Sequence, residues 1–172
     1  MMNNILEYGK GFVLAAVIVL AIVVWKSFPF GELYVSDIED WEVVSWNWSE
    51  PQRNVTINGQ SLIINEILYE KGIGAHAPTV LKVLTPPGYT HFVADVGVSD
   101  EVLNEAPSSI QFRVWGDGVI LYETPVIGAD SPAYRIDVNI QWTGELLLEA
   151  TDAGDGANSD HAIWGNARFI SR

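Results

Sequence analysis

The sequence predicts an all-β domain, a β-sandwich, that follows one N-terminal transmembrane α-helix. Residues 11–25 are apolar without interruption, which indicates the helix. After Gly31 the pattern changes to short runs of β-branched and aromatic residues broken by Gly, Pro, Asn and Asp, with no long helical periodicity. A length of 172 residues suits one such domain with an appendage.

The N-terminal segment 11–25 reads GFVLAAVIVLAIVVW and is apolar on every face. Fifteen helical residues span about 22 Å against a hydrocarbon core of about 30 Å, so we expect Lys10 and Lys26 to reach toward the headgroups. A cleaved signal peptide is the alternative, but no small-residue cleavage site follows Val24. The predicted organisation is a short tail at 1–10, the membrane helix with its interfacial flank at 11–30, a linker at 31–33 and the domain at 34–172.

Small residues in this predicted helix would allow another membrane helix to approach closely. They are Gly11, Ala15, Ala16 and Ala21. We therefore expect the lipid bilayer and integral membrane subunits as partners. One Lys flanks each end, so charge alone does not set the orientation.

Nine segments after Gly31 have the composition of strands. Alternate residues are apolar in 92–98 and 110–114, as in strands with one face on a core. Gly116-Asp117-Gly118 predicts a tight hairpin, and two sheets of such strands make a sandwich. The predicted strands are Trp41–Trp46, Ser61–Ile64, Val80–Leu84, His91–Val98, Ile110–Val114, Val119–Glu123, Tyr134–Val138, Glu145–Ala150 and Ala162–Ile170.

Charge and cysteine content exclude several functions. The net charge is −13, and the only charged residues in 1–30 are Glu7, Lys10 and Lys26, so the acidity belongs to the predicted domain. A surface this acidic repels phosphate backbones, which argues against nucleic acid as a partner. The sequence has no Cys, so disulfides and thiolate metal sites are excluded.

Four sequence stretches, in order, resemble the NPCBM domain, a carbohydrate-binding module family found on bacterial glycoside hydrolases. The stretches are Tyr34-Val-Ser-Asp37, Tyr69-Glu-Lys-Gly-Ile-Gly-Ala-His-Ala77, Val96-Gly-Val-Ser-Asp-Glu101 and the tail, Thr151 to Gly156 with Asp160 to Ala167. The resemblance implies a galactose-binding-like jelly-roll sandwich, sugar binding and, among relatives, a structural calcium ion. It also implies an extracytoplasmic domain, with the N-terminus cytoplasmic.

One Gly-rich loop collects oxygen ligands of the kind that calcium requires. They are Asp152, Asp155, Asn158 and Asp160. The spacing is not that of an EF-hand, and a solvated Asp/Gly turn is the alternative interpretation. A structural calcium ion is therefore the one cofactor that we consider.

A sugar or docking surface is expected to combine indole faces with polar side chains. We take Trp46, Trp48 and Trp164 as its aromatic residues, and expect Trp41, Trp115 and Trp142 in the core. The polar candidates are Asn47, Arg53, His76, Asp160 and His161.

Catalysis is not expected. His76 and His161 lie in apolar stretches with no third metal ligand or Ser nucleophile at recognisable spacing, and structural roles are the alternative for both. Asp100 and Glu101 are the carboxylates considered for a glycosidase, but we expect them in a solvated loop. The protein is therefore predicted not to be an enzyme.

Two functions of different classes fit these observations. Because no catalytic domain accompanies the module in this sequence, we expect first a non-catalytic accessory subunit of a larger membrane complex, respiratory or photosynthetic among the possible hosts, with the sandwich as an extracytoplasmic docking domain. The alternative is a membrane-tethered module that binds galactose-type or envelope glycans.

Overall fold

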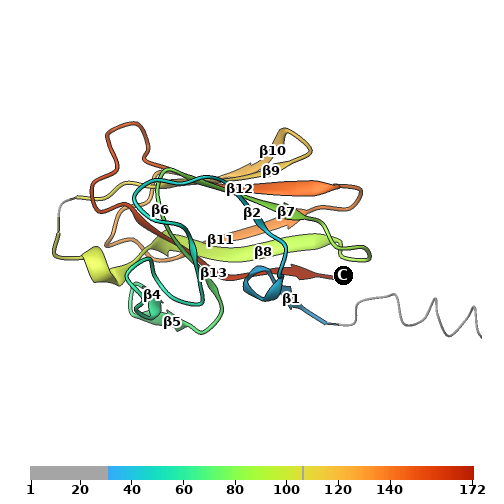
Figure 1. Ribbon diagram of the computed structural model, residues 1–172, viewed down its shortest axis with the longest axis horizontal. Coiled ribbons are helices and arrows are strands. Elements are labelled where there is room, and N and C mark those ends of the chain that lie inside the picture. The colour runs from blue at the N-terminus through green and yellow to red at the C-terminus, as the bar shows by residue number, and fades with distance from the viewer. Residues whose placement is uncertain (1–30, 106) are drawn as a thin grey trace, which may run out of the picture.

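The computed structural model describes residues 31–105 and 107–172, which form two antiparallel sheets packed face to face (Figure 1). The predicted β-sandwich is confirmed. The predicted membrane helix at 11–30, with its packing residues Gly11, Ala15, Ala16 and Ala21, lies outside the described residues. Within the described ranges, no helix is long and apolar enough to cross a membrane.

The first sheet, sheet A, has the order β11-β8-β13-β6-β3, and β1 pairs with the last residues of β13. Sheet B has the order β10-β9-β12-β7-β2, and β4 and β5 form a separate hairpin. Sheet A comprises β1 (Leu33–Tyr34), β3 (Gln52–Arg53), β6 (Gly72–His76), β8 (His91–Val98), β11 (Tyr134–Asn139) and β13 (His161–Ile170). Sheet B comprises β2 (Glu42–Ser45), β7 (Thr79–Leu84), β9 (Gln111–Gly116), β10 (Val119–Glu123) and β12 (Glu145–Thr151). The hairpin is β4 (Leu62–Ile64) with β5 (Ile67–Tyr69), and two 3-10 turns are η1 (Val35–Asp37) and η2 (Asp100–Val102).

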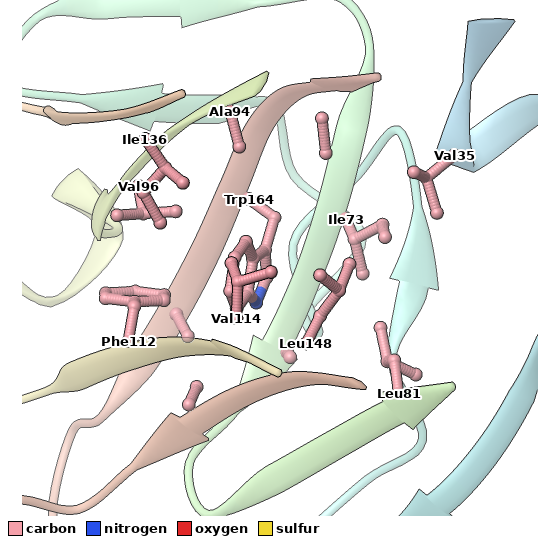
Figure 2. Packing of buried hydrophobic residues seen from close by; sticks show 14 of the residues in the cluster. Val35, Ile73, Leu81, Ala94, Val96, Phe112, Val114, Ile136, Leu148 and Trp164 are labelled. Atoms are coloured by element: carbon pink, nitrogen blue, oxygen red, sulfur yellow. The ribbon is translucent and has the colours of Figure 1, made fainter. Parts of the chain in front are cut away.

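The main core lies between the two sheets and is built from the alternate, inward-facing residues of each strand. Trp164 of β13 and Phe112 of β9 are fully buried, and their rings meet edge to face with centroids 5.1 Å apart. Figure 2 shows this pair among the aliphatic residues of both sheets. The contact joins the sheets through the two largest side chains in the view.

The β4–β5 hairpin packs on the outer face of sheet A and makes a second, smaller core with Ile163. Two glycines allow the chain to pack closely on this face, Gly165 under the hairpin and Gly74 under the preceding segment around Thr56. A Cβ at Gly165 would lie 2.6 Å from the ring of Tyr69, and one at Gly74 would lie 2.6 Å from Thr56 Cα. The outer face of sheet A is therefore covered by chain on this side rather than open to solvent.

Most of the predicted strands are confirmed, and two match the observed bounds, 91–98 and 119–123. The hairpin turn is also confirmed, with Asp117 and Gly118 both at positive φ, as a primed turn requires. The short strands β1, β3 and β5 were not predicted. Neither was β6, because Gly72 and Gly74 replace the side chains that mark a strand.

The sandwich has two ends that carry different loops. The end where β13 begins also carries the loops 99–110 and 152–160; we call it the distal end. The other, which we call the entry end, carries Leu33, the C-terminus and the loops 85–90, 117–118 and 140–144 (Figure 1).

Candidate functional site

Two histidines face each other at the distal end, where β6 ends and β13 begins. His76 and His161 are direct cross-strand partners, with ring centroids 5.2 Å apart. Their neighbours Ala75 and Ala162 lie in the main core. Because side chains alternate along a strand, both imidazoles project from the outer face of sheet A.

Hydrogen bonds set the tautomer of each imidazole. The Nδ1 of His161 lies 2.6 Å from Glu101 Oε1, and Glu101 Oε2 accepts from the Thr56 hydroxyl at 2.9 Å. The Nδ1 of His76 lies 2.8 Å from the carbonyl oxygen of Ala77. Since a carboxylate and a carbonyl oxygen only accept hydrogen bonds, both Nδ1 atoms must donate. In the neutral rings, each Nε2 is therefore an acceptor.

Burial lowers the pKa of His76, because desolvation penalises the charged ring; the neighbouring His161 lowers it further, while the bond to the Ala77 carbonyl acts in the opposite direction. The neutral ring of His76 is thus favoured over the protonated ring more than in a solvent-exposed histidine. This keeps its Nε2 available as an acceptor for a hydroxyl group.

Trp48 supplies an aromatic surface beside this pair. Ser45, the last residue of β2, pairs with Val80 near the start of β7. The loop that follows β2 and contains Trp48 therefore lies at the distal end. The Trp48 ring lies nearly parallel to His76, with an interplanar angle of 21° and centroids 6.1 Å apart, yet its side chain is 83% exposed. Its φ of 67° is a conformation that bulky residues rarely adopt. An exposed indole held in this way can stack on the apolar face of a sugar.

Two other predicted members belong to the same loop. The Asn47 amide lies 3.4 Å from the carbonyl oxygen of Ala77, which also accepts from His76. Trp46 is 51% exposed. The structure thus brings Asn47, Trp48, His76 and His161 together, and Trp46 immediately precedes Asn47 in the chain.

Glu101 is a member of this cluster that sequence reasoning missed. We expected a solvated loop, but its side chain is only 8% exposed and links His161 to Thr56. The sequence signal was the Ser99-Asp-Glu motif itself, in which Ser99 caps the η2 turn by accepting from the Glu101 amide. That turn directs the carboxylate toward the start of β13.

Two predicted ligand residues have different roles. Trp164 is 1% exposed in the main core, so its prediction as a surface residue is wrong. Arg53 donates to the carbonyl oxygens of Ser36, Ile38 and Glu39, and its guanidinium lies 4.1 Å from the centre of the Trp41 ring. Arg53 therefore stabilises the segment around η1 through hydrogen bonds and does not contribute to the histidine pair.

The other tryptophan predictions are mixed. Trp142 was expected in the core but is 93% exposed, at the entry end. Trp41 is partly buried and packs against the main core, as predicted. Trp115 alternates with the inward-facing residues of β9 and donates its indole N–H to Glu149 at 2.7 Å on the outer face of sheet B, so its prediction as a core residue is wrong.

The acidic loop forms a separate feature at the distal end. Asp152 accepts from the Gly154 amide and Asp155 accepts from the Ser109 hydroxyl, while Asn158 is exposed. Asp160 is fully buried; one of its oxygens accepts from the Ser109 amide, and the other, Oδ2, has no hydrogen-bond partner. The pKa of Asp160 is raised to about 6, mainly by burial and also by the charges of Asp155 and Asp152, while the hydrogen bond from the Ser109 amide acts in the opposite direction.

This loop bears on the predicted calcium ion. Over the described residues, no three His, Cys, Asp or Glu side chains are grouped as metal ligands. The unpaired Oδ2 of Asp160, in the field of two further carboxylates, is nevertheless the kind of oxygen that a cation satisfies. Asp160, with Asp152, Asp155 and Asn158 of the same loop, would hold the calcium ion, and its presence stays a prediction.

Comparison with known proteins identifies several relatives of the described domain. Residues 31–170 match the profile of the NPCBM/NEW2 domain. A Renibacterium salmoninarum protein, provisionally named endo-alpha-N-acetylgalactosaminidase, is 27% identical over 83% of this chain and 10% of its own length. The chain thus spans about a tenth of that curated relative.

Two solved structures from Clostridium perfringens have sugars bound. The CBM51 module of a GH95 protein, in complex with methyl-galactose, is 26% identical with a TM-score of 0.76, over 81% of this chain and all of that one. The second CBM51 module of ZmpB, solved with its INT domains and GlcNAc, is 29% identical with a TM-score of 0.77, over 82% of this chain and 32% of that one.

Proposed function

Since this chain belongs to the NPCBM/NEW2 domain family, we propose that it is a non-catalytic module that binds a terminal galactose-type sugar at the distal end of its sandwich. The observation that supports this most directly is the cluster of Trp48, His76, His161 and Glu101. It combines one exposed indole with two imidazoles of set tautomer. That combination suits a ligand with one apolar face and several hydroxyl groups.

Each residue has a distinct role in this proposal. Trp48 stacks on the apolar face of the pyranose, where C–H groups are exposed. The Nε2 atoms of His76 and His161 accept hydrogen bonds from sugar hydroxyls. Glu101 positions His161 by holding its Nδ1, and Thr56 holds Glu101 in turn. None of these steps requires bond cleavage, which agrees with a binding function.

The comparisons favour glycan binding over the accessory-subunit function that we expected first. The two solved relatives are modules with bound sugars, and both share the fold of this chain. Docking in a respiratory or photosynthetic complex has no comparable observation in its favour.

The sequence also supports a membrane tether for the module. Residues 11–25 have the composition of a transmembrane helix, and we place the sandwich on the extracytoplasmic side. Protease added to intact cells or spheroplasts is then expected to digest the domain. Digestion only after lysis would reverse this orientation.

Glycan arrays and titration with galactose, using the full chain in mild detergent, test the binding proposal. Trp48→Ala is expected to weaken galactose binding about tenfold or more, which corresponds to about 1.4 kcal/mol. Trp142→Ala is a matched control, because Trp142 is also highly exposed and at positive φ but lies at the entry end. Equal affinities for the two variants and the unaltered chain would exclude the Trp48 site, and an array without bound glycans would exclude the function.

A further inference from the structure

The entry end exposes three large apolar side chains. Trp142 in the β11–β12 loop is 93% exposed, Val119 at the start of β10 is 64% exposed, and Leu84 at the end of β7 is 63% exposed. Hydrogen bonds join the segments that carry them. The Thr85 amide donates to the carbonyl oxygen of Gly144, and the carboxylate of Asp117 accepts from the Gly144 amide. We call Leu84, Val119 and Trp142 the entry patch.

Folding does not explain the exposure of Trp142. Its φ of 73° lies in the left-handed region, which is costly for a bulky side chain. A fully exposed indole recovers none of that cost by packing in the core. A strained, exposed aromatic residue of this kind points to a contact outside the described domain.

The chain enters the domain at this same end. A chain of contacts links Leu33 to the loop that carries Trp142. Leu33 pairs with Phe169 of β13, and the neighbouring Ile170 carbonyl accepts from the Thr90 amide. The Thr90 carbonyl in turn accepts from the amide of Ile140, where that loop begins. Leu33 and the loop that carries Trp142 are thus separated by about three strand spacings, or about 15 Å. The chain from Trp25 to Leu33 spans at most about 28 Å. An apolar segment at 11–25 in a bilayer would therefore keep the entry end close to the lipid.

Charges differ between the two ends in the direction that this placement requires. Two carboxylates at or near the entry end are paired with cations, Asp137 with Arg172 at 2.8 Å and Glu145 with Lys82 at 3.5 Å, while Asp117 accepts from backbone amides. Arg168 Nε also lies 3.0 Å from Glu32, although this contact is poorly aligned as a hydrogen bond. The distal loops 99–110 and 152–160 contain no Lys or Arg. Their six carboxylates are Asp100, Glu101, Glu105, Asp152, Asp155 and Asp160.

We propose that the entry patch rests on the lipid bilayer, with Trp142 at the level of the headgroups. Tryptophan favours this interface because its ring is apolar and its N–H is polar. The acidic distal end is repelled by anionic lipid and points away from the bilayer. The domain is then held in one orientation, with the Trp48 site facing outward. This inference rests on the membrane tether proposed above and is independent of which glycan binds.

Site-directed nitroxide labels on the full chain in phosphatidylcholine vesicles test this orientation. The sequence has no cysteine, so each introduced cysteine carries the only label. Leu84→Cys reports on the entry patch, and Leu103→Cys is the matched control, because Leu103 is an exposed leucine at the distal end. Accessibility is measured to oxygen, which concentrates in lipid, and to a water-soluble nickel chelate.

A higher ratio of oxygen to nickel accessibility at position 84 than at position 103 is expected. Adding Trp142→Asn should lower the ratio at 84 toward that at 103, since Asn tolerates positive φ but lacks the indole. Equal, aqueous ratios in a chain that stays with the vesicles after carbonate washing would overturn the proposal and leave the tether intact. Release by carbonate would overturn the tether and the proposal together. A label at 84 shielded from both reagents would indicate a protein contact and also overturn it.

Discussion

The buried carboxyl of Asp160 makes a specific prediction about pH and stability. In the metal-free protein its pKa is raised to about 6 from 3.8, because the group is buried, has one unpaired oxygen and lies in the field of Asp155 and Asp152. A raised pKa means that the folded state favours the protonated acid. The stabilisation is therefore present below pH 3.8 and is lost as the pH rises through about 6.

The size of this loss follows from the shift in pKa. One pKa unit corresponds to 1.36 kcal/mol, so a shift of about two units destabilises the folded state by about 2 to 3 kcal/mol at pH 7 relative to pH 4. Asp160→Asn removes the titrating group and keeps an oxygen for the bond from the Ser109 amide. The variant is expected to lack this part of the pH dependence.

Urea unfolding of the full chain in mild detergent with chelator, followed by tryptophan fluorescence, measures both proteins at pH 4 and pH 7. The quantity compared is the pH 4 to pH 7 change in free energy of unfolding, wild type minus variant, because all other carboxyl groups cancel. A difference near zero would show that Asp160 is not destabilised by its surroundings. The argument for a cation at its Oδ2 would then lose its physical basis.

Two further predictions concern calcium and the covered face of sheet A. Calcium in excess should raise the melting temperature, and chelator should reverse the rise. At 100 times the dissociation constant, bound calcium adds about 2.7 kcal/mol to the free energy of unfolding. A melting temperature that is unchanged by chelator and by Asp155→Ala would favour the plain turn. Gly74→Ala should destabilise the fold by about 1 to 3 kcal/mol in urea unfolding, because its Cβ would meet the backbone of Val55 and Thr56. Gly128→Ala is the control, since its Cβ has ordinary contacts only, and equal stability of the two variants would contradict this close approach.

The sequence by itself determined the sandwich, because alternation with period two is a local property of the chain. Residues 111–116 show the pattern within six residues, and the Asp117-Gly118 turn was recognisable from its residue types. Strand β6 was missed because Gly72 and Gly74 leave no pattern to read. Their reason is tertiary: the segment around Thr56 packs directly against the Gly74 backbone, a contact that sequence spacing does not reveal.

The candidate site was only partly predictable for the same reason. His76 and Trp48 could be named from residue type, but the role of Glu101 depends on its contact with His161, sixty residues further along the chain. Tryptophan suits a core and a surface equally, so the sequence could not assign Trp164 to the core or Trp142 to the entry end. Only the tertiary structure decided this, because burial depends on which strands pair and how the two sheets pack.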